Sequence, residues 1–192
     1  MKIYFHPNLS DGSNSYIILN TKTKEAIIVD PGKITKEMIA HIENDKYTLS
    51  GILITHSRDQ TKESIQTLRR IYNPKIYSAD TDLFGKDAKI LQGDGLIKVA
   101  SFNISYFAIA GHSPDSVAFK IENAIFTGDV LLAGVVGKTT NPYARKLLTT
   151  NIQTKLLLYS NDTIIYPCHG PLTTIASEKK FNLAFGCLTK EQ

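Results

Sequence analysis

Four short segments of the chain carry the side chains that could do chemistry. In each, a polar residue of a metal-binding or catalytic type directly follows a predicted buried strand, where loops display functional groups. The segments are residues 55–61, 111–116, 127–129 and 167–171. Their candidate metal ligands are His56, His112, Asp129 and His169, because imidazole and carboxylate groups bind zinc and iron.

The order and spacing of these segments matter more than any one of them. A histidine at a strand end is more often a structural, hydrogen-bonded residue than a ligand, and a Gly-Asp pair is more often a turn. The chain has 5 histidines, and only His6 and His41 fall outside the four segments. This concentration favours one shared site over scattered structural histidines.

Strands and helices that would position these segments follow from hydrophobic periodicity. In the first half, the pattern predicts strands over 2–5, 15–19, 26–29, 51–54 and 75–78, and helices over 36–44 and 61–72. In the second half, it predicts strands over 96–99, 102–109, 116–121, 124–127 and 163–166, a loop over 131–146, and helices over 151–159 and 175–185. Two similar strand-then-helix halves indicate two sheets packed face to face with helices outside.

The composition is that of a folded globular chain. It has 192 residues, of which 42% are hydrophobic and 21% charged, so we expect one domain over residues 1–192. The formal net charge of +4 comes from basic residues scattered along the chain, which does not indicate nucleic acid as a partner. We therefore expect a small-molecule ligand.

The cellular compartment is predicted from the lack of a signal-peptide pattern and of a membrane-spanning segment in the sequence. The first residues contain no apolar segment typical of a signal peptide. The longest apolar run, residues 130–136, is far below the ~20 residues that a membrane-spanning helix needs. We expect a cytoplasmic protein without a membrane partner, and we expect Cys168 and Cys187 to be free thiols.

Taken together, the motifs resemble those of the metallo-β-lactamase superfamily, and within it the short proteins similar to glyoxalase II. The matching motifs are Asp-Pro-Gly at 30–32, part of Thr-His-x-His-x-Asp-His at 55–61, Gly-His-Ser-Pro at 111–114, Gly-Asp at 128–129, His-Gly-Pro at 169–171, and a tail with Glu178 and Asn182. The resemblance implies an α/β (α+β) fold, a four-layer αββα sandwich called the metallo-β-lactamase fold. It also implies a two-ion metal site at the edge of the two sheets.

Only part of that metal site is present by this resemblance. His56 and His112 match ligands of the first ion, His169 matches a ligand of the second, and Asp129 matches the bridging aspartate. Arg58, Gln60 and Thr61 stand where the family has His, Asp and His. The resemblance therefore implies a hydrolase-like protein whose metal site is degraded.

The substitutions change the expected chemistry, so we take Asp129, Gln60 and Arg58 as the catalytic candidates. A guanidinium roughly 5 Å from a dication is repelled by about 6–7 kcal/mol at an effective dielectric of ~20. Gln60 can hydrogen-bond to a water molecule but cannot take its proton. The two-ion mechanism is therefore not expected.

Two hypotheses remain open for this site. In the first, His56, His112 and Asp129, with or without His169, hold one zinc or iron ion with an open position, Arg58 points outward, and the protein hydrolyses a small ester or thioester. In the second, the site binds no metal, Arg58 forms an ion pair with Asp129, and the protein is an inactive ligand-binding or interaction module. The C-terminal glutathione-binding domain of full-length glyoxalase II has no counterpart here, which argues against glutathione thioesters.

Overall fold

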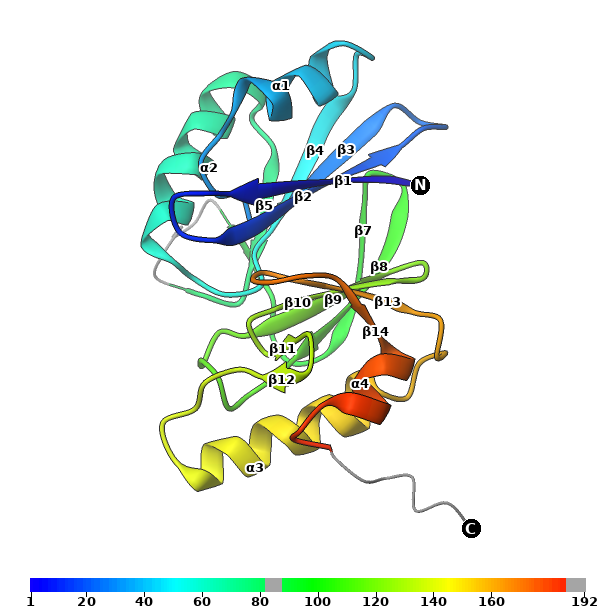
Figure 1. Ribbon diagram of the computed structural model, residues 1–192. Helices are drawn as coiled ribbons and strands as arrows, with labels where there is room; N and C mark the ends of the chain where they lie inside the picture. The colour runs from blue at the N-terminus through cyan, green and yellow to red at the C-terminus, as the bar shows by residue number, and fades with distance from the viewer. Residues whose placement is uncertain (82–87, 186–192) are drawn as a thin grey trace.

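Two six-stranded sheets and four α-helices form the layers of the part of the chain that the structure describes. The computed structural model describes residues 1–81 and 88–185. Figure 1 shows the sheets face to face, with α1 and α2 on the outer side of one sheet and α3 and α4 on the outer side of the other. The predicted αββα sandwich is therefore confirmed.

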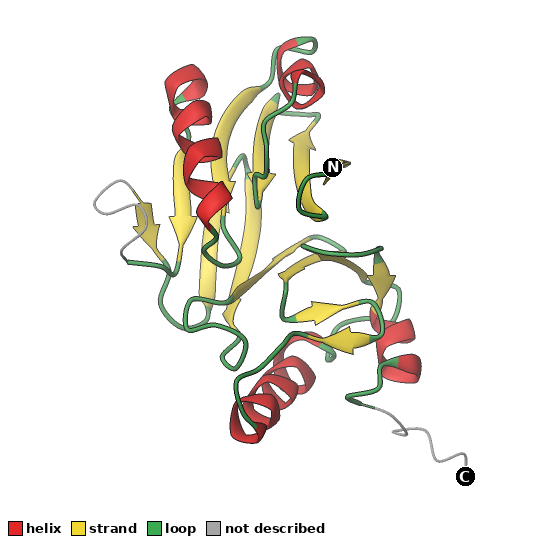
Figure 2. Cartoon of the chain, turned by 60° about the vertical axis from the view of Figure 1, so that its left-hand side comes forward, coloured by secondary structure: helices red, strands yellow, loops and turns green. Residues whose placement is uncertain are grey.

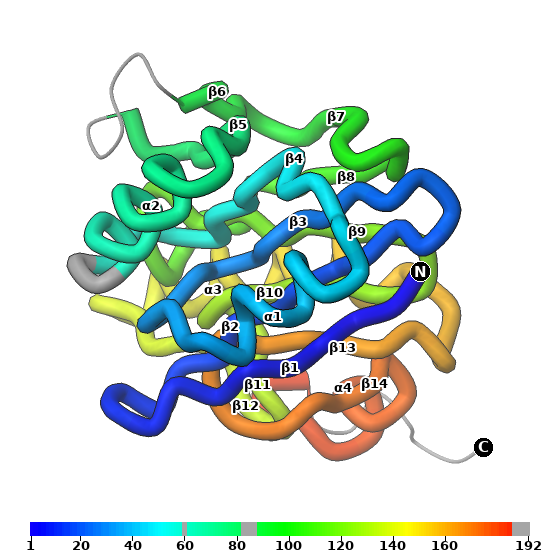
Figure 3. Tube along the Cα trace, turned by 90° about the horizontal axis from the view of Figure 1, so that it is seen from above, coloured from blue at the N-terminus to red at the C-terminus, as the bar shows by residue number. Residues whose placement is uncertain are grey.

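The first sheet has the strand order β1-β2-β3-β4-β5-β6. Its strands are β1 (Lys2–Asn8), β2 (Ser13–Asn20), β3 (Glu25–Val29), β4 (Thr48–Leu53), β5 (Lys75–Ser78) and β6 (Ala88–Ile90). The first three pair antiparallel and the last four pair parallel. In Figure 3, α1 (Lys36–Glu43) and α2 (Asp59–Tyr72) lie over this sheet.

The second sheet has the order β14-β13-β10-β9-β8-β7. Its strands are β7 (Gly95–Val99), β8 (Phe102–Ala108), β9 (Val117–Ile121), β10 (Ala124–Gly128), β13 (Ile164–Pro167) and β14 (Thr173–Thr174). Figure 2 shows the helices of this half outside the sheet. They are α3 (Pro142–Asn151), which continues as a π-helical segment (Ile152–Leu156), and α4 (Ile175–Phe181).

Three apolar clusters fill the three spaces between the layers. The middle cluster lies between the sheets and includes Tyr16, Phe119 and Phe126, each at most 1% exposed. One outer cluster joins the first sheet to α1 and α2, and the other joins the second sheet to α3 and α4. Because the strands are packed on both faces, their ends and the loops that follow them are the natural places for polar groups.

The largest difference from the predicted elements lies before α3. The helix begins at Pro142 and not at 151, and the segment predicted as a loop also contains β11 (Leu131–Leu132) and β12 (Val135–Val136). The Asn141 side chain accepts a hydrogen bond from Ala144 N, and Pro142 occupies the first turn, so this start has both usual signals. Leu148 and Ile152 then face the core.

Smaller differences concern short strands and helix ends. The short strands β6 and β14 were not predicted, because their apolar content is too low to show a pattern. The helix predicted to end at 185 ends at Phe181. Among the described residues, no helix is long and apolar enough to cross a membrane.

Candidate metal centre

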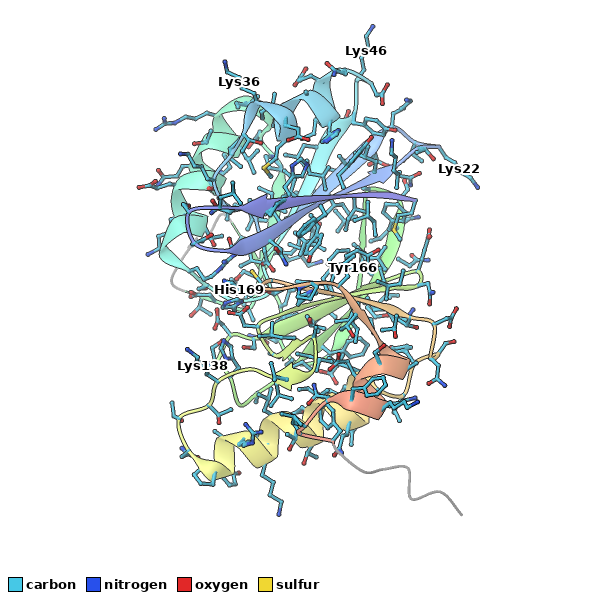
Figure 4. All side chains as sticks on the ribbon, in the orientation of Figure 1. Lys22, Lys36, Lys46, Lys138, Tyr166 and His169 are labelled. Atoms are coloured by element: carbon cyan, nitrogen blue, oxygen red, sulfur yellow. The ribbon has the colours of Figure 1, made fainter. Side chains whose placement is uncertain are left out.

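The four candidate ligands come together at one edge of the sandwich. His56 follows β4, His112 lies beyond β8, Asp129 directly follows β10, and His169 lies beyond β13. All four loops leave the carboxyl ends of their strands. Figure 4 shows His169 at this edge, between the two sheets, with Lys138 on the same side of the molecule.

The ligand atoms lie close enough to share one ion. One atom each from His56, His112 and Asp129 form a group within 4.8 Å of one another, and atoms of Asp129, Cys168 and His169 form a second such group. His56 Nε2 lies 3.4 Å from Asp129 Oδ2, and His169 Nδ1 lies 2.7 Å from Asp129 Oδ1. Asp129 is thus the shared member of both groups.

His56 is oriented by a buried hydrogen-bond chain that begins at Asp30. Asp30 Oδ1 accepts from the backbone N–H of Thr55 at 2.8 Å, and Oδ2 accepts from the Thr55 hydroxyl at 2.7 Å. Since that hydroxyl proton goes to Asp30, the Thr55 oxygen accepts from His56 Nδ1 at 3.1 Å. With Nδ1 protonated, Nε2 is the ring nitrogen that faces Asp129. It donates to the carboxylate when the ring is charged and offers a lone pair to a metal ion when the ring is neutral.

His112 is oriented in the same way by the backbone. Its Nδ1 lies 2.9 Å from the carbonyl oxygen of Lys138. A carbonyl can only accept, so Nδ1 carries the proton and Nε2 carries the lone pair. In metal sites the second ring nitrogen of a histidine ligand usually makes such a bond.

Gly128 lets the two halves approach each other at this edge. Its φ is +56°, in the left-handed region that favours glycine, and a Cβ there would lie 2.3 Å from Thr55 Oγ1. A side chain at this position would therefore displace the residue that orients His56.

The loop that carries His169 is held by β2 of the opposite sheet. The Asn14 backbone N–H donates to the Cys168 carbonyl at 2.7 Å, and its side-chain amide donates to the carbonyls of Pro167 and Gly170 at 3.0 and 2.8 Å. The Tyr16 hydroxyl also donates to Pro167 O, at 2.6 Å. These contacts cross between the sheets and hold His169 against Asp129.

The electrostatics of Asp129 follow from its two histidine neighbours. Burial alone would raise the pKa of Asp129, but the hydrogen bonds from His56 and His169 outweigh burial and hold that pKa far below its usual range. Burial lowers the pKa of His56, and the bond to Asp129 outweighs it in turn, so this pKa is raised. Without an ion, a proton shared with the histidines therefore balances the carboxylate.

Arg58 points into the site, but it does not form the ion pair with Asp129 expected under the metal-free hypothesis. Among the described residues, no ion pair or hydrogen bond joins its guanidinium to a carboxylate, and its Nε is buried without a partner. Burial lowers its pKa, and the nearby Cys168, Asp30, Asp129 and Asp11 raise it above the usual value. These neighbours also rule out the outward orientation expected under the single-metal hypothesis.

Of the other residues singled out from the sequence, Thr61 and Cys168 have described side chains. Thr61 is 1% exposed, in the first turn of α2. Cys168 is a buried free thiol whose pKa is raised by burial. The side chain of Gln60 and all of Cys187 lie outside the described residues.

Sequence reasoning missed the residues that support the ligands. Asp30 and Thr55 are the first residues of two of the matching motifs, so their positions carried a signal, although their hydrogen-bonding roles did not follow from it. Asn14 and the Lys138 carbonyl carried none, since they act through contacts between segments far apart in the chain.

Comparisons with known proteins agree with this architecture. No protein-family model matches the chain. It is 30% identical to the hydroxyacylglutathione hydrolase GloC of Haemophilus influenzae over 183 residues, covering 83% of this chain and 86% of that protein.

Two crystal structures have the same fold. The BLEG-1 B3 metallo-β-lactamase superposes with a TM-score of 0.82 at 26% identity, covering 96% of this chain and 99% of that one. TTHA1623, solved in a di-iron-bound form, has a TM-score of 0.78 at 22% identity, covering 94% and 98% of the two chains. Similarity in both sequence and fold over most of its length shows that the chain belongs to the metallo-β-lactamase superfamily.

Proposed function

We propose that the protein is a hydrolase of small esters or thioesters that works with a single metal ion. The observation that carries this proposal is the group formed by His56, His112 and Asp129, whose ligand atoms lie within 4.8 Å of one another. Both histidines have Nδ1 committed to an oxygen acceptor, so each offers the Nε2 lone pair. A three-ligand set with such support suits a catalytic zinc or iron(II) ion.

When bound, such an ion lowers the pKa of a coordinated water toward neutrality and polarises a carbonyl group. The chain's own residues orient the reaction. Asp129 holds the Nδ1 proton of His169, so that His169 Nε2 is free to accept a proton from water and pass it to the leaving group. The His169 side chain is 35% exposed, which gives it access to substrate and solvent.

We propose further that the second ion of the family has no site here. Arg58, Gln60 and Thr61 stand at three positions where the family has metal ligands. A buried threonine and a glutamine are poor metal ligands, and a guanidinium repels a dication. The inward Arg58 supports this proposal because its positive charge lies near Asp129 and Asp30 and would repel a further dication there.

The substrate class is the least constrained part of the proposal. GloC of H. influenzae is named a hydroxyacylglutathione hydrolase, and 86% of its length aligns with this chain. A chain of this length can therefore carry that name without a separate glutathione-binding domain, so glutathione thioesters belong among the substrates to test. We propose that residues 1–192 act as one domain on a small molecule in the cytoplasm, with neither nucleic acid nor a membrane as partner.

One observation favours the alternative, a metal-free ligand-binding module. Asp129 already has His169 at 2.7 Å and His56 at 3.4 Å, so the carboxylate is balanced without an ion. The ion pair with Arg58 expected for this alternative is not formed, and neither is the outward Arg58 expected for the single-metal hydrolase. Our choice between the two therefore rests on the group of His56, His112 and Asp129, which favours the single-metal hydrolase.

The test begins with protein purified without added metal. We expect about one zinc or iron per chain by elemental analysis, a melting temperature that rises with added zinc, and hydrolysis of a hydroxyacylglutathione thioester or of p-nitrophenyl acetate. His112→Ala should lose the ion and the activity, whereas the matched control His41→Ala, at a histidine outside the centre, should keep both. A metal-free wild type, or full activity in His112→Ala, would contradict the proposal.

A further inference from the structure

The guanidinium of Arg58 has hydrogen-bond donors that the protein itself does not use. Arg58 is the N-cap residue of α2, yet its side chain makes no capping bond. Its Nε is buried and has no partner. A buried donor without an acceptor is costly, and such groups in native proteins call for an explanation, often a functional one.

Its acidic neighbours balance its charge without accepting its protons. The groups that act on it most strongly are Cys168, Asp30, Asp129 and Asp11. The three carboxylates bond elsewhere: Asp30 to Thr55, Asp129 to His169, and Asp11 to Ser13. The guanidinium is therefore held in the site by surrounding charge, and its donors have no acceptor among the side chains that the structure describes.

The carboxylates around Arg58 differ in how strongly they favour the charged form. Burial raises the pKa of Asp30, whereas hydrogen bonds outweigh burial and hold the pKa of Asp11 and of Asp129 below the usual range. The amino end of α2, where Arg58 lies, adds partial positive charge. New negative charge on a substrate oxygen beside Arg58 would be stabilised by the fixed charge of the guanidinium and by its donors.

Resting on the proposed single-metal hydrolase, we propose that Arg58 is a catalytic residue that donates hydrogen bonds to the substrate's carbonyl oxygen as it becomes an oxyanion. Water adds to the carbonyl carbon, and the carbonyl π electrons move to the oxygen that Arg58 contacts. These electrons then re-form the carbonyl while the bond to the sulfur or alcohol oxygen breaks. The leaving group takes the proton that the water lost, which gives an acid and a thiol or alcohol.

The test compares three variants at two arginines. Arg58→Met removes charge and donors, Arg58→Lys keeps the charge without the planar fork, and Arg70→Met is the control, an exposed arginine on the same helix. The measurements are metal content, kcat and KM for the hydroxyacylglutathione thioester, and calorimetric binding of methylphosphonate as a tetrahedral oxyanion probe. Arg58→Lys also serves if Arg58→Met does not fold.

We expect Arg58→Met to keep its ion and lose about 100-fold in kcat with a small change in KM. Its affinity for methylphosphonate should fall at least about ten-fold, Arg58→Lys should recover part of both losses, and Arg70→Met should match the wild type.

An Arg58→Met protein with wild-type kcat and wild-type probe affinity overturns the role of Arg58 and leaves the single-metal hydrolase standing. If wild type holds an ion but hydrolyses neither the hydroxyacylglutathione thioester nor p-nitrophenyl acetate, methylphosphonate binding is the test of Arg58. Binding that depends on Arg58 supports its oxyanion contact, and binding that does not depend on Arg58 overturns it. A wild type without any ion overturns both proposals together.

Discussion

The two halves of the chain contribute unlike loops to the same site edge. The second half supplies His112, Asp129 and His169, and each has a hydrogen-bond partner that fixes its orientation. The first half supplies the loop after β4, in which a hydrogen bond to Thr55 likewise orients His56. The same loop carries Arg58, whose buried Nε has no partner among the described residues. The difference separates a group of candidate metal ligands, which both halves build, from the buried positive charge of Arg58, which the first half alone supplies.

The largest effect is expected where the two halves share a residue. Asp129→Ala removes the carboxylate common to both ligand groups, so metal affinity should fall by more than about 100-fold. Elemental analysis after dialysis measures the loss, and Asp45→Ala, at an exposed aspartate, is the control. Retention of a full equivalent of metal by Asp129→Ala would place the ion elsewhere.

A second substitution disturbs the contact between the halves and leaves the candidate ligands themselves unchanged. Gly128→Ala places a methyl group 2.3 Å from Thr55 Oγ1 at a φ of +56°, so it should destabilise the fold by about 2–4 kcal/mol and weaken metal binding. Gly93→Ala is a matched control, with a φ of +62° and open space around the Cβ, and should cost about 1 kcal/mol. Equal effects in chemical denaturation would mean that the approach of Gly128 to Thr55 has no special role.

A smaller effect is expected from the support of His56 in the first half. Thr55→Val keeps the shape but leaves Asp30 Oδ2 and His56 Nδ1 without their shared partner. Metal affinity should fall about 10- to 100-fold, as measured by competition with a chelator. Thr67→Val, on the exposed face of α2, should change nothing, and a wild-type affinity in Thr55→Val would show that the chain from Asp30 does not orient the ligand.

The smallest effect distinguishes the two ligand groups that share Asp129. Cys168→Ala should leave metal content and affinity unchanged if His56, His112 and Asp129 hold the ion. The thiol is buried, and its raised pKa disfavours the thiolate that a metal would need. Loss of the ion in Cys168→Ala would instead assign it to the group with Cys168 and His169.

The fold was predictable from sequence where local patterns are strong, and the site only in part. Alternating apolar runs located the long strands, and motif order predicted four candidate ligands that the structure brings together at one edge. The start of α3 was missed although Asn141 and Pro142 marked it, because apolar spacing was weighted over capping. The orientation of Arg58 could not be predicted, since it depends on Asp11, Asp30 and Asp129, which come from three separate loops.

We propose as the central claim that this edge holds one ion because Arg58, Gln60 and Thr61 replace metal ligands of the family. The most direct measurement counts metal ions per chain, after saturation with zinc and gel filtration, in wild type and in a variant combining Arg58→His, Gln60→Asp and Thr61→His. We predict one ion in wild type and two in the variant. No ion in wild type, or two ions in both proteins, would contradict the account.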